Sequence, residues 1–544
     1  MKDQNPGPDP SPRENDPDDL FKFLSEGGKI RAFVPGVLDV FREIKWKYHI
    51  KTLKEYETDR ESMYLYDGDH FSVANPDGTT SRGDPVNPKT VGTYRRGEPE
   101  LKRIADATMI GLIEENIKRA LESGDPEDEE ILKKLNRKRK HDGIRTSEVN
   151  EVLNMLRRYT FVDRSEMNPE SHIPLINGIL NLKTWQLEDF NPRYFYTWKV
   201  NGRYDPSVRS LNDVPQFKKF LLSAYRPESI PTILDYLGYC FYPGFPRQKI
   251  LVIVGTPGMG KGTLARIMEF AMPEGYGRIS LMKLLDPSNK FALQSIEGKN
   301  LPVDMEIKRQ IKKSADFDVI NSLFGGDVLP LEKKFKAEIN YIAKSKGILI
   351  GNLPLFYVNN MAFMRRLFIV STQDERKGPE IPDLAEKIWK AEGDKIVSLL
   401  LNRLRSLIAR NYIFSNERTT DETADLWETL ADTVRAFVEE RTEPVDNELP
   451  VLTSEAYEKY REYCSEKGIP PQKEHEFVRI FSKHYEKTRI RRRGENPEYH
   501  FAGVRFLTEL SVRMEKERDE QFKRERDEET DRAYHEIFDG YFDG

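Results

Sequence analysis

The middle of the chain carries a glycine-rich segment whose residue types suit phosphate binding: Gly255-Thr256-Pro257-Gly258-Met259-Gly260-Lys261-Gly262-Thr263. Glycines let the backbone curl so that successive N–H groups point at phosphate oxygens, and Lys261 would reach the β- and γ-phosphates. Gly262 stands where a Ser or Thr usually holds magnesium, and Thr263 follows it. The segment predicts a nucleoside triphosphate site, with Thr263 or a water molecule as magnesium ligand.

The residues on both sides predict the elements that such a loop needs. Residues 250–254 are all apolar, as in a parallel strand buried on both faces. After the loop, Leu264, Ile267, Met268 and Ala271 have the spacing of one helix face. We therefore expect strand, loop and helix in that order.

Polar groups that end or precede later apolar segments could act on the γ-phosphate. Either Asp304 or Glu306 could hold magnesium, directly or through water, and polarise the attacking water. Asn352 ends another apolar segment and could hydrogen bond to the γ-phosphate. Arg365 or Arg366 could stabilise the transferring phosphoryl group as an arginine finger, within the chain or across a subunit interface.

Composition indicates a large protein with real cores and excludes several classes. The 544 residues are 38% hydrophobic, and this length corresponds to about three or four domains. No apolar stretch reaches the roughly 18 residues of a membrane span, so we expect a cytoplasmic protein without membrane contact. Two cysteines exclude a disulfide framework. With a formal net charge of −5, any DNA contact must come from local basic surfaces.

Shifts in composition divide the chain into five parts. The first is rich in proline and acids and reads as a disordered arm. The last is almost continuously charged, as in a solvated helix or a tail. The predicted parts are the arm (1–20), an N-terminal domain (21–205), the nucleotide-binding domain (206–395), a C-terminal domain (420–510) and the tail (511–544).

Within the N-terminal domain we expect helices over residues 36–54 and 147–159, the latter with Val149, Val152, Leu153 and Leu156 on one face. Two hairpins are expected, one over 62–73 and one turning at Asn177-Gly178. The Asp67-Gly68-Asp69 triplet could hold metals as in a primase, but Asp-Gly is favoured in turns for backbone reasons. We interpret it as a turn.

Five segments follow one another along the chain in the order of the motifs of superfamily 3 helicases. They resemble motif A (GTPGMGKGT), motif B (LPVDMEIK), motif B′ (GGDVLPLEKKFKAE), motif C (GILIGNLPL) and the arginine finger (MRRLFIV). The resemblance is to the primase-helicase group of phages, plasmids and large DNA viruses. Residues 160–205 resemble that group's helicase-associated N-terminal domain, and residues 460–504 its C-terminal winged helix. The implied fold is an α/β P-loop (AAA+-like) ATPase with a parallel sheet, preceded by an α+β domain and followed by a winged-helix domain.

The resemblance implies a replicative, ATP-dependent DNA helicase of a virus, plasmid or mobile element, which translocates on single-stranded DNA as a ring. ATP and Mg²⁺ would be its cofactors, Thr263 and Asp304 its metal ligands, and forked DNA its substrate. The ring is usually a homohexamer, and a separate primase or polymerase is a possible partner. Lys333, Lys334 and Lys336 would lie on a hairpin in the central channel, since lysines bind phosphates of any sequence. The alternative is a merely solvated lysine run.

The C-terminal domain is expected to contain helices over 454–467 and 473–485, followed by two strands around a basic wing with Arg491, Arg492 and Arg493. Two helices followed by a basic hairpin form an arrangement that docks on DNA, although such domains also bind proteins.

Two other functions fit parts of the sequence. The loop also resembles that of adenylate kinases, but a lid and a nucleoside-monophosphate site have no counterpart here. The alternative that we retain is an ATP-regulated origin-binding or replication-initiation protein with little unwinding activity.

Overall fold

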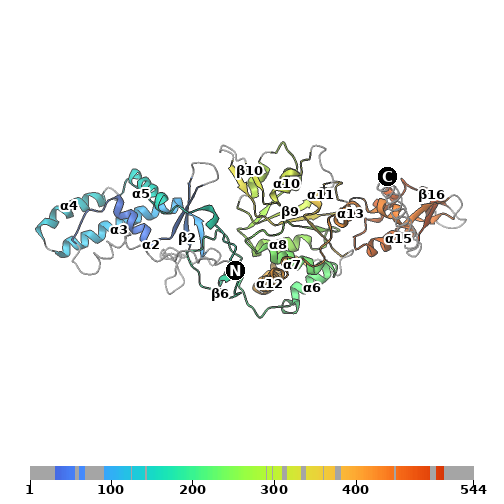
Figure 1. The fold of residues 1–544 in the computed structure, drawn as a ribbon, viewed down its shortest axis with the longest axis horizontal. Helices are drawn as coiled ribbons and strands as arrows, with labels where there is room; N and C mark the ends of the chain where they lie inside the picture. Colours follow the sequence, from blue (N-terminus) through green and yellow to red (C-terminus); the bar gives the residue numbers. More distant parts are fainter. Residues whose placement is uncertain are drawn as a thin grey trace, which may run out of the picture. The chain divides into compact units, whose positions relative to one another are not determined.

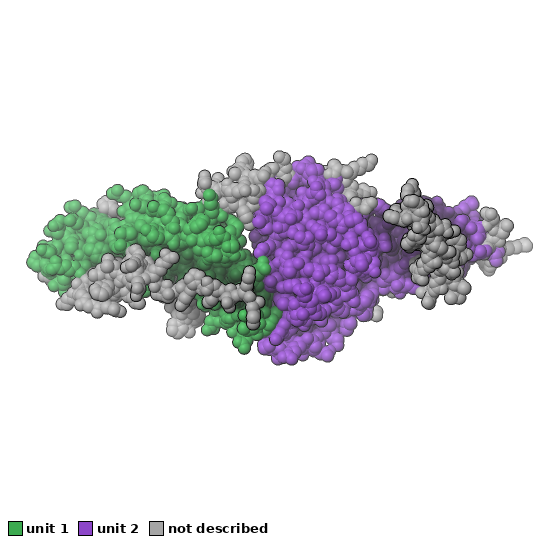
Figure 2. Space-filling model, viewed as in Figure 1, with its two compact units in different colours: residues 1–202 green, residues 203–544 purple. Residues whose placement is uncertain are grey.

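The computed structural model describes residues 31–54, 61–67, 91–123, 125–140, 144–289, 291–296, 298–308, 315–331, 339–353, 355–358, 360–373, 381–445, 449–490 and 498–507. The chain divides into two compact units, residues 1–202 and 203–544, which Figure 2 colours separately. The predicted arm and tail lie outside the described residues.

The first unit combines helices with two small antiparallel sheets, ordered β1-β2-β3 and β4-β5-β6 (Figure 1). The predicted apolar face of residues 149–156 is buried, in a core that also takes side chains from α2 and α3. The elements are α2 (Val37–Lys47), β1 (Ile50–Lys54), β2 (Glu61–Asp67), β3 (Thr93–Arg96), α3 (Glu98–Ser123), α4 (Pro126–Lys140), α5 (Thr146–Tyr159), η1 (Arg164–Glu166), β4 (His172–Leu175), β5 (Gly178–Asn181) and β6 (Leu187–Glu188).

One prediction near the start of this unit is wrong. The helix expected over 36–54 ends at Lys47, and residues 50–54 form strand β1 against β2. Apolar residues over so short a stretch fit either period, and pairing with β2 decides between them. The hairpin expected over 62–73 reaches beyond the described residues after Asp67; within them, β2 pairs with β1 on one side and with β3 on the other.

The second predicted hairpin is confirmed, with its turn displaced by one residue. Leu175 pairs with Gly178, so Ile176 and Asn177 form the turn and Gly178 begins β5. Gly178 has φ +139, and a Cβ there would lie 2.5 Å from the carbonyl oxygen of Glu188. Glycine is therefore required at the start of β5, both by its own backbone conformation and by the neighbouring strand β6.

A five-stranded parallel sheet forms the core of the second unit, in the order β13-β7-β12-β9-β8. Strand β7 lies between β13 and β12, and all five of its residues are buried, as the apolar run predicted. Helix α12 packs against α7 and α8 (Figure 1).

This part consists of η2 (Leu211–Asp213), α6 (Pro215–Ala224), α7 (Ser229–Cys240), β7 (Ile250–Val254), α8 (Lys261–Ala271), β8 (Tyr276–Arg278), α9 (Leu281–Leu284), η3 (Ala292–Ile296), β9 (Leu301–Ile307), α10 (Asp318–Leu323), β10 (Val328–Leu331), β11 (Ile339–Ile342), β12 (Gly347–Gly351), α11 (Met361–Met364), β13 (Leu367–Ser371), α12 (Leu384–Ala409) and α13 (Thr420–Ala431).

The structure moves two predicted boundaries. The limit at 395 falls inside α12, which continues to Ala409. The limit at 420 assigns α13 to the C-terminal domain, yet α13 is bonded to the segment after β12. The N–H of Leu355 donates to the Leu430 carbonyl at 3.0 Å, and the indole of Trp427 donates to the Phe356 carbonyl at 2.9 Å. The nucleotide-binding part therefore extends through α13.

The remaining described residues form helices around an aromatic core, with a three-stranded antiparallel sheet ordered β15-β17-β16. Phe437, Tyr460, Phe477 and Phe481 pack in ring-to-ring contact. The second expected helix is shorter than predicted and ends at Phe481. The elements are α14 (Thr433–Arg441), β14 (Thr442–Pro444), β15 (Val451–Leu452), α15 (Thr453–Glu466), α16 (Glu474–Phe481), β16 (Glu486–Ile490), β17 (Glu498–Ala502) and β18 (Val504–Phe506).

Candidate nucleotide site

The glycine loop, residues 255–263, connects the carboxyl end of β7 to the first turn of α8. Gly258 and Gly260 have φ +83 and +81, in the left-handed region that glycine tolerates. A Cβ on Gly260 would lie 2.8 Å from Cε2 of Phe220, whereas a Cβ on Gly258 would meet open space. The loop thus packs against α6 on one side and exposes its backbone on the other, directly before a helix N-terminus.

Lys261 is buried at the first position of α8 and is 7% exposed. Its Nζ donates to the carbonyls of Gly255 and Thr256, both at 2.7 Å, and to Oδ1 of Asn352 at 2.9 Å. Burial lowers the pKa of Lys261 from 10.5 to about 8. The structure therefore brings together the lysine and the amide that the sequence predicted from separate segments.

A cavity of about 640 Å³ opens beside this lysine. The glycine loop lines it together with Met305, Ile350 and Asn352. Its remaining wall comes from α6, from the segment before α12 and from the start of α12, namely Gln216, Lys219, Phe220, Ser223, Ala224, Ile381, Leu384 and Ile388. Sequence reasoning missed this wall, because no motif marks it; the amphipathic pattern of α6 was the one available signal.

The two predicted acids of β9 have different surroundings. Asp304 is buried, with Oδ2 accepting from the N–H of Leu281 at 2.6 Å and Oδ1 from the N–H of Glu306 at 3.0 Å. Burial raises the pKa of the Asp304 carboxyl. Glu306 is exposed. Of the described β9 residues, Met305 lines the cavity. Asp304 thus holds the start of α9, and Glu306 is the acid with a free approach to solvent.

The two predicted arginines also differ. Arg366 is 4% exposed and donates to Oδ1 of Asn321 at 3.3 Å and to the Ala362 carbonyl. Burial lowers its pKa. Arg365 is exposed, and its Nη2 donates to Oε1 of Gln248 at 3.2 Å. Of the two, Arg365 is therefore the side chain that is exposed at the surface of the described residues, whereas Arg366 is held inside.

The sheet separates Arg365 from the glycine loop of the same chain. Strands β7 and β13 are parallel and in register from Ile250 opposite Leu367 to Val254 opposite Ser371. The loop follows the last residue of β7, whereas Arg365 precedes the first residue of β13. Five residues at about 3.3 Å each span about 16 Å. The arginine and the loop therefore lie at opposite ends of the sheet.

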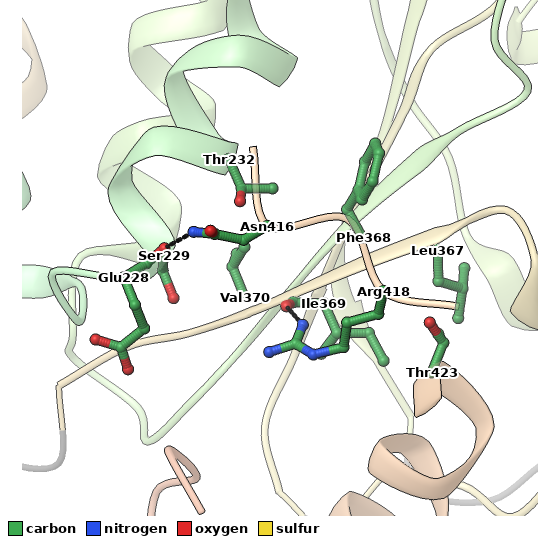
Figure 3. A pocket seen from close by; sticks show the side chains of 10 residues that line it. All are labelled: Glu228, Ser229, Thr232, Leu367, Phe368, Ile369, Val370, Asn416, Arg418 and Thr423. Atoms are coloured by element: carbon green, nitrogen blue, oxygen red, sulfur yellow. Dashed lines mark hydrogen bonds between the residues drawn. The ribbon is translucent and has the colours of Figure 1, made fainter. Parts of the chain in front are cut away.

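A second, smaller cavity of about 210 Å³ lies along β13, which is an edge strand (Figure 3). Arg418 donates from Nη1 to the Ile369 carbonyl at 3.1 Å, and Asn416 donates from Nδ2 to the Glu228 carbonyl at 2.8 Å. Both residues belong to the linker between α12 and α13. The linker is therefore bonded to the edge strand and to the residue before α7.

The predicted magnesium ligands are Thr263 and Asp304. Within the described ranges, no three His, Cys, Asp or Glu side chains come together as a metal site. Each oxygen of Asp304 accepts one backbone N–H, and its role as a magnesium ligand stays a prediction. Thr263 lines the cavity and remains a suitable ligand.

No described helix is long and apolar enough to cross a bilayer.

The predicted DNA-binding residues lie outside the described residues, but the strands around them are described. Lys333, Lys334 and Lys336 fall between β10 and β11, which pair antiparallel from Val328 opposite Ile342 to Leu331 opposite Ile339. Arg491, Arg492 and Arg493 fall between β16 and β17, which are also antiparallel. Both basic groups thus belong to segments that join paired strands.

Three family models match separate parts of the chain. Residues 43–225 match "D5 N terminal like", residues 253–366 match a "family of unknown function (DUF5906)", and residues 430–512 match "Poxvirus D5 protein-like". Two of the descriptions name D5. One of these names a poxvirus protein, and the two D5 matches lie on either side of the glycine loop. The chain matches none of the curated proteins with which it was compared.

Solved structures of the NrS-1 C-terminal region are also similar to this chain. The A form apo structure is 11% identical, with a TM-score of 0.33, over 57% of this chain and 79% of that chain. A further apo structure is 12% identical, with a TM-score of 0.32, over 59% of this chain and 82% of that chain.

Proposed function

We propose that this protein is a replicative, ATP-dependent DNA helicase of the superfamily 3 type, from a virus, plasmid or mobile element. The observation that carries the proposal is the contact between Lys261 and Asn352 at the mouth of a cavity, at the carboxyl ends of two adjacent parallel strands. Ligands of open parallel sheets bind at that edge. The finer fold assignment, a P-loop AAA+-like domain followed by a winged helix, belongs to the same proposal.

The glycine loop fits a triphosphate. Its backbone faces the cavity. The ammonium of Lys261 donates to two loop carbonyls and to the Asn352 amide, and on nucleotide binding it would donate to phosphate oxygens instead. Asn352 would then hydrogen bond to the γ-phosphate or to the attacking water. Glu306 would act as general base through a water molecule. Magnesium, when bound with the nucleotide, would neutralise phosphate charge, held by the Thr263 hydroxyl and water.

The position of Arg365 supports a shared site between subunits. About 16 Å of strand separates it from its own glycine loop, so it would serve the nucleotide of a neighbour as an arginine finger. A ring of identical subunits, which we propose to be a hexamer, satisfies this requirement for every site at once.

Single-stranded and forked DNA are the proposed substrates. Lys333, Lys334 and Lys336 would contact phosphates from the connection between β10 and β11, and Arg491, Arg492 and Arg493 from that between β16 and β17. Phosphate contacts carry no base identity, which suits a motor that must move along any sequence.

The test is ATP turnover and strand separation on a forked DNA, for the wild type and for Lys261→Ala. We expect DNA-stimulated turnover and unwinding in the wild type, and neither in the variant. Removing an arginine finger costs about 10³ or more in rate, so Arg365→Ala should also be inactive. Mixed under conditions of subunit exchange, Lys261→Ala and Arg365→Ala should regain turnover, because some interfaces then pair an intact loop with an intact arginine.

Two results would change the proposal. ATP-dependent assembly on DNA without unwinding would favour the origin-binding initiation protein. Assembled and exchanged mixtures without recovered turnover would refute the shared site, although ATP binding at the glycine loop could stand.

A further inference from the structure

Arg365 is held at two points by consecutive residues that precede β7. Its guanidinium Nη2 donates to Oε1 of Gln248 at 3.2 Å, and its carbonyl accepts from Nζ of Lys249 at 3.0 Å. The next residue, Ile250, donates its N–H to the Arg366 carbonyl at 2.7 Å. The main chain and the side chain of Arg365 are both fixed by the segment that leads into the glycine-loop strand.

Gln248 is itself anchored. Its Nε2 donates to the Gly325 carbonyl at 2.7 Å, which leaves the amide oxygen as the acceptor for Arg365. The side chain is half-buried. Rotation of the amide would place an N–H against the guanidinium, so the bond to Gly325 fixes which atom faces Arg365. This orientation limits the conformations of a long side chain that must otherwise be ordered during catalysis.

Lys249 is anchored by the linker between α12 and α13. Its Nζ lies 3.0 Å from Oε1 of Glu417 and 4.7 Å from the centre of the Phe368 ring. Burial lowers the pKa of Lys249, and Glu417 opposes that shift by favouring the charged form. Arg247 also pairs with Glu417.

The neighbours of Glu417 hold its backbone in place. Figure 3 shows Asn416 bonded to the Glu228 carbonyl and Arg418 bonded to the Ile369 carbonyl on β13. The Glu417 carboxylate, which contacts Lys249, therefore belongs to a segment whose two flanking residues are hydrogen bonded. The contacts that hold Arg365 thus lead from Lys249 to Glu417, and the linker that carries Glu417 is bonded to the edge strand β13.

We propose that Gln248 and Lys249 are positioning residues, which aim Arg365 away from its own subunit and at the nucleotide of the next one. This inference rests on the proposed shared site. Gln248 contacts the arginine and not the loop of its own chain, so its loss should lower the rate at the neighbouring site and leave ATP binding unchanged.

The test compares Gln248→Leu, which removes both hydrogen bonds, with Gln248→Glu, which keeps the acceptor for Arg365 and loses the donor to Gly325. Gln294→Leu, at an exposed position on η3, is the control for the change of residue type. We expect Gln248→Leu to lower kcat about tenfold with an unchanged KM, since a hydrogen bond to a charged group and its geometry are lost. Gln248→Glu should stay within about threefold of the wild type.

Mixing identifies which site is affected. Gln248→Leu should regain turnover with Lys261→Ala, which supplies an intact Gln248 and Arg365, and should regain none with Arg365→Ala, because both partners then lack a well-aimed arginine. If Gln248→Leu does not assemble, as judged by sedimentation, the smaller Gln248→Ala replaces it, since water can fill the space at a half-buried position.

Equal losses in Gln248→Leu and Gln248→Glu would overturn the proposal, because the bond to Gly325 would then be the one that matters. Wild-type turnover in Gln248→Leu, with Arg365→Ala inactive and complemented by Lys261→Ala, would remove the positioning role and keep the shared site. Wild-type turnover in Arg365→Ala would remove both.

Discussion

Nucleotide binding should be coupled to protonation of Lys261. Burial lowers the pKa of this lysine to about 8 in the free protein, and a bound phosphate would raise it again, because opposite charge favours the ammonium. Binding therefore takes up a proton in the pH range where the free lysine is neutral. From the pKa of about 8, we expect an uptake of about 0.1 proton per site at pH 7, about 0.5 at pH 8 and about 0.9 at pH 9.

The apparent affinity should follow from the same linkage. Above pH 8 the free protein must first protonate the lysine, so Kd should rise with a limiting slope of about tenfold per pH unit. Isothermal titration calorimetry with a nonhydrolysable ATP analogue measures the uptake, when each pH is repeated in two buffers of different ionisation enthalpy.

Lys261→Arg is the matched control, because arginine stays charged throughout this range. Its binding should take up no additional proton between pH 7 and pH 9. An uptake in the wild type that does not change with pH, or an equal increase in Lys261→Arg, would refute the assignment of the buried lysine as the titrating group.

Three further predictions concern the residues around this lysine. Glu306→Gln and Asn352→Ala should each bind ATP with near-normal Kd and release phosphate at least tenfold more slowly, about 1.4 kcal/mol of barrier or more; loss of binding in a filter assay would show that their roles are misassigned. Asp304→Asn should lower the free energy of unfolding by about 1–3 kcal/mol, because its amide turns a donor toward a backbone N–H; unchanged stability in urea denaturation would contradict the support of α9. Gly260→Ala should weaken ATP binding with the fold retained, since a left-handed alanine costs about 1–2 kcal/mol and its Cβ would meet Phe220; wild-type Kd in calorimetry would contradict the required loop geometry.

The sequence predicted best where chemistry and local pattern coincide. The apolar run before Gly255 and the helical spacing after it both describe one short stretch, and both are confirmed. Asn352 could be associated with Lys261 because the ends of parallel strands meet at one edge of a sheet. That inference needed no knowledge of strand order.

Long-range pairing and burial were harder to predict. β2 pairs with β3 across a long intervening segment, and nothing in residues 61–67 identifies that partner. The choice between Arg365 and Arg366 depends on which side chain faces Asn321, a residue from a separate helix. Likewise, Asp304 and Glu306 are alike in type, and what distinguishes them is the burial of Asp304 against the N–H of Leu281. A single sequence contains no signal for such contacts.

In the proposed ring, strand β7 would connect two nucleotide sites. One end of this strand carries the loop for a subunit's own nucleotide, and the other end begins beside the residues that hold Arg365. Its five residues are wholly buried between two neighbouring strands, and close-packed interiors of this kind transmit displacement with little compression. A shift of the strand at one nucleotide would thus move the arginine presented to the next. In the proposed ring, hydrolysis at neighbouring sites would then be coupled through each subunit, because the strand connects two nucleotides.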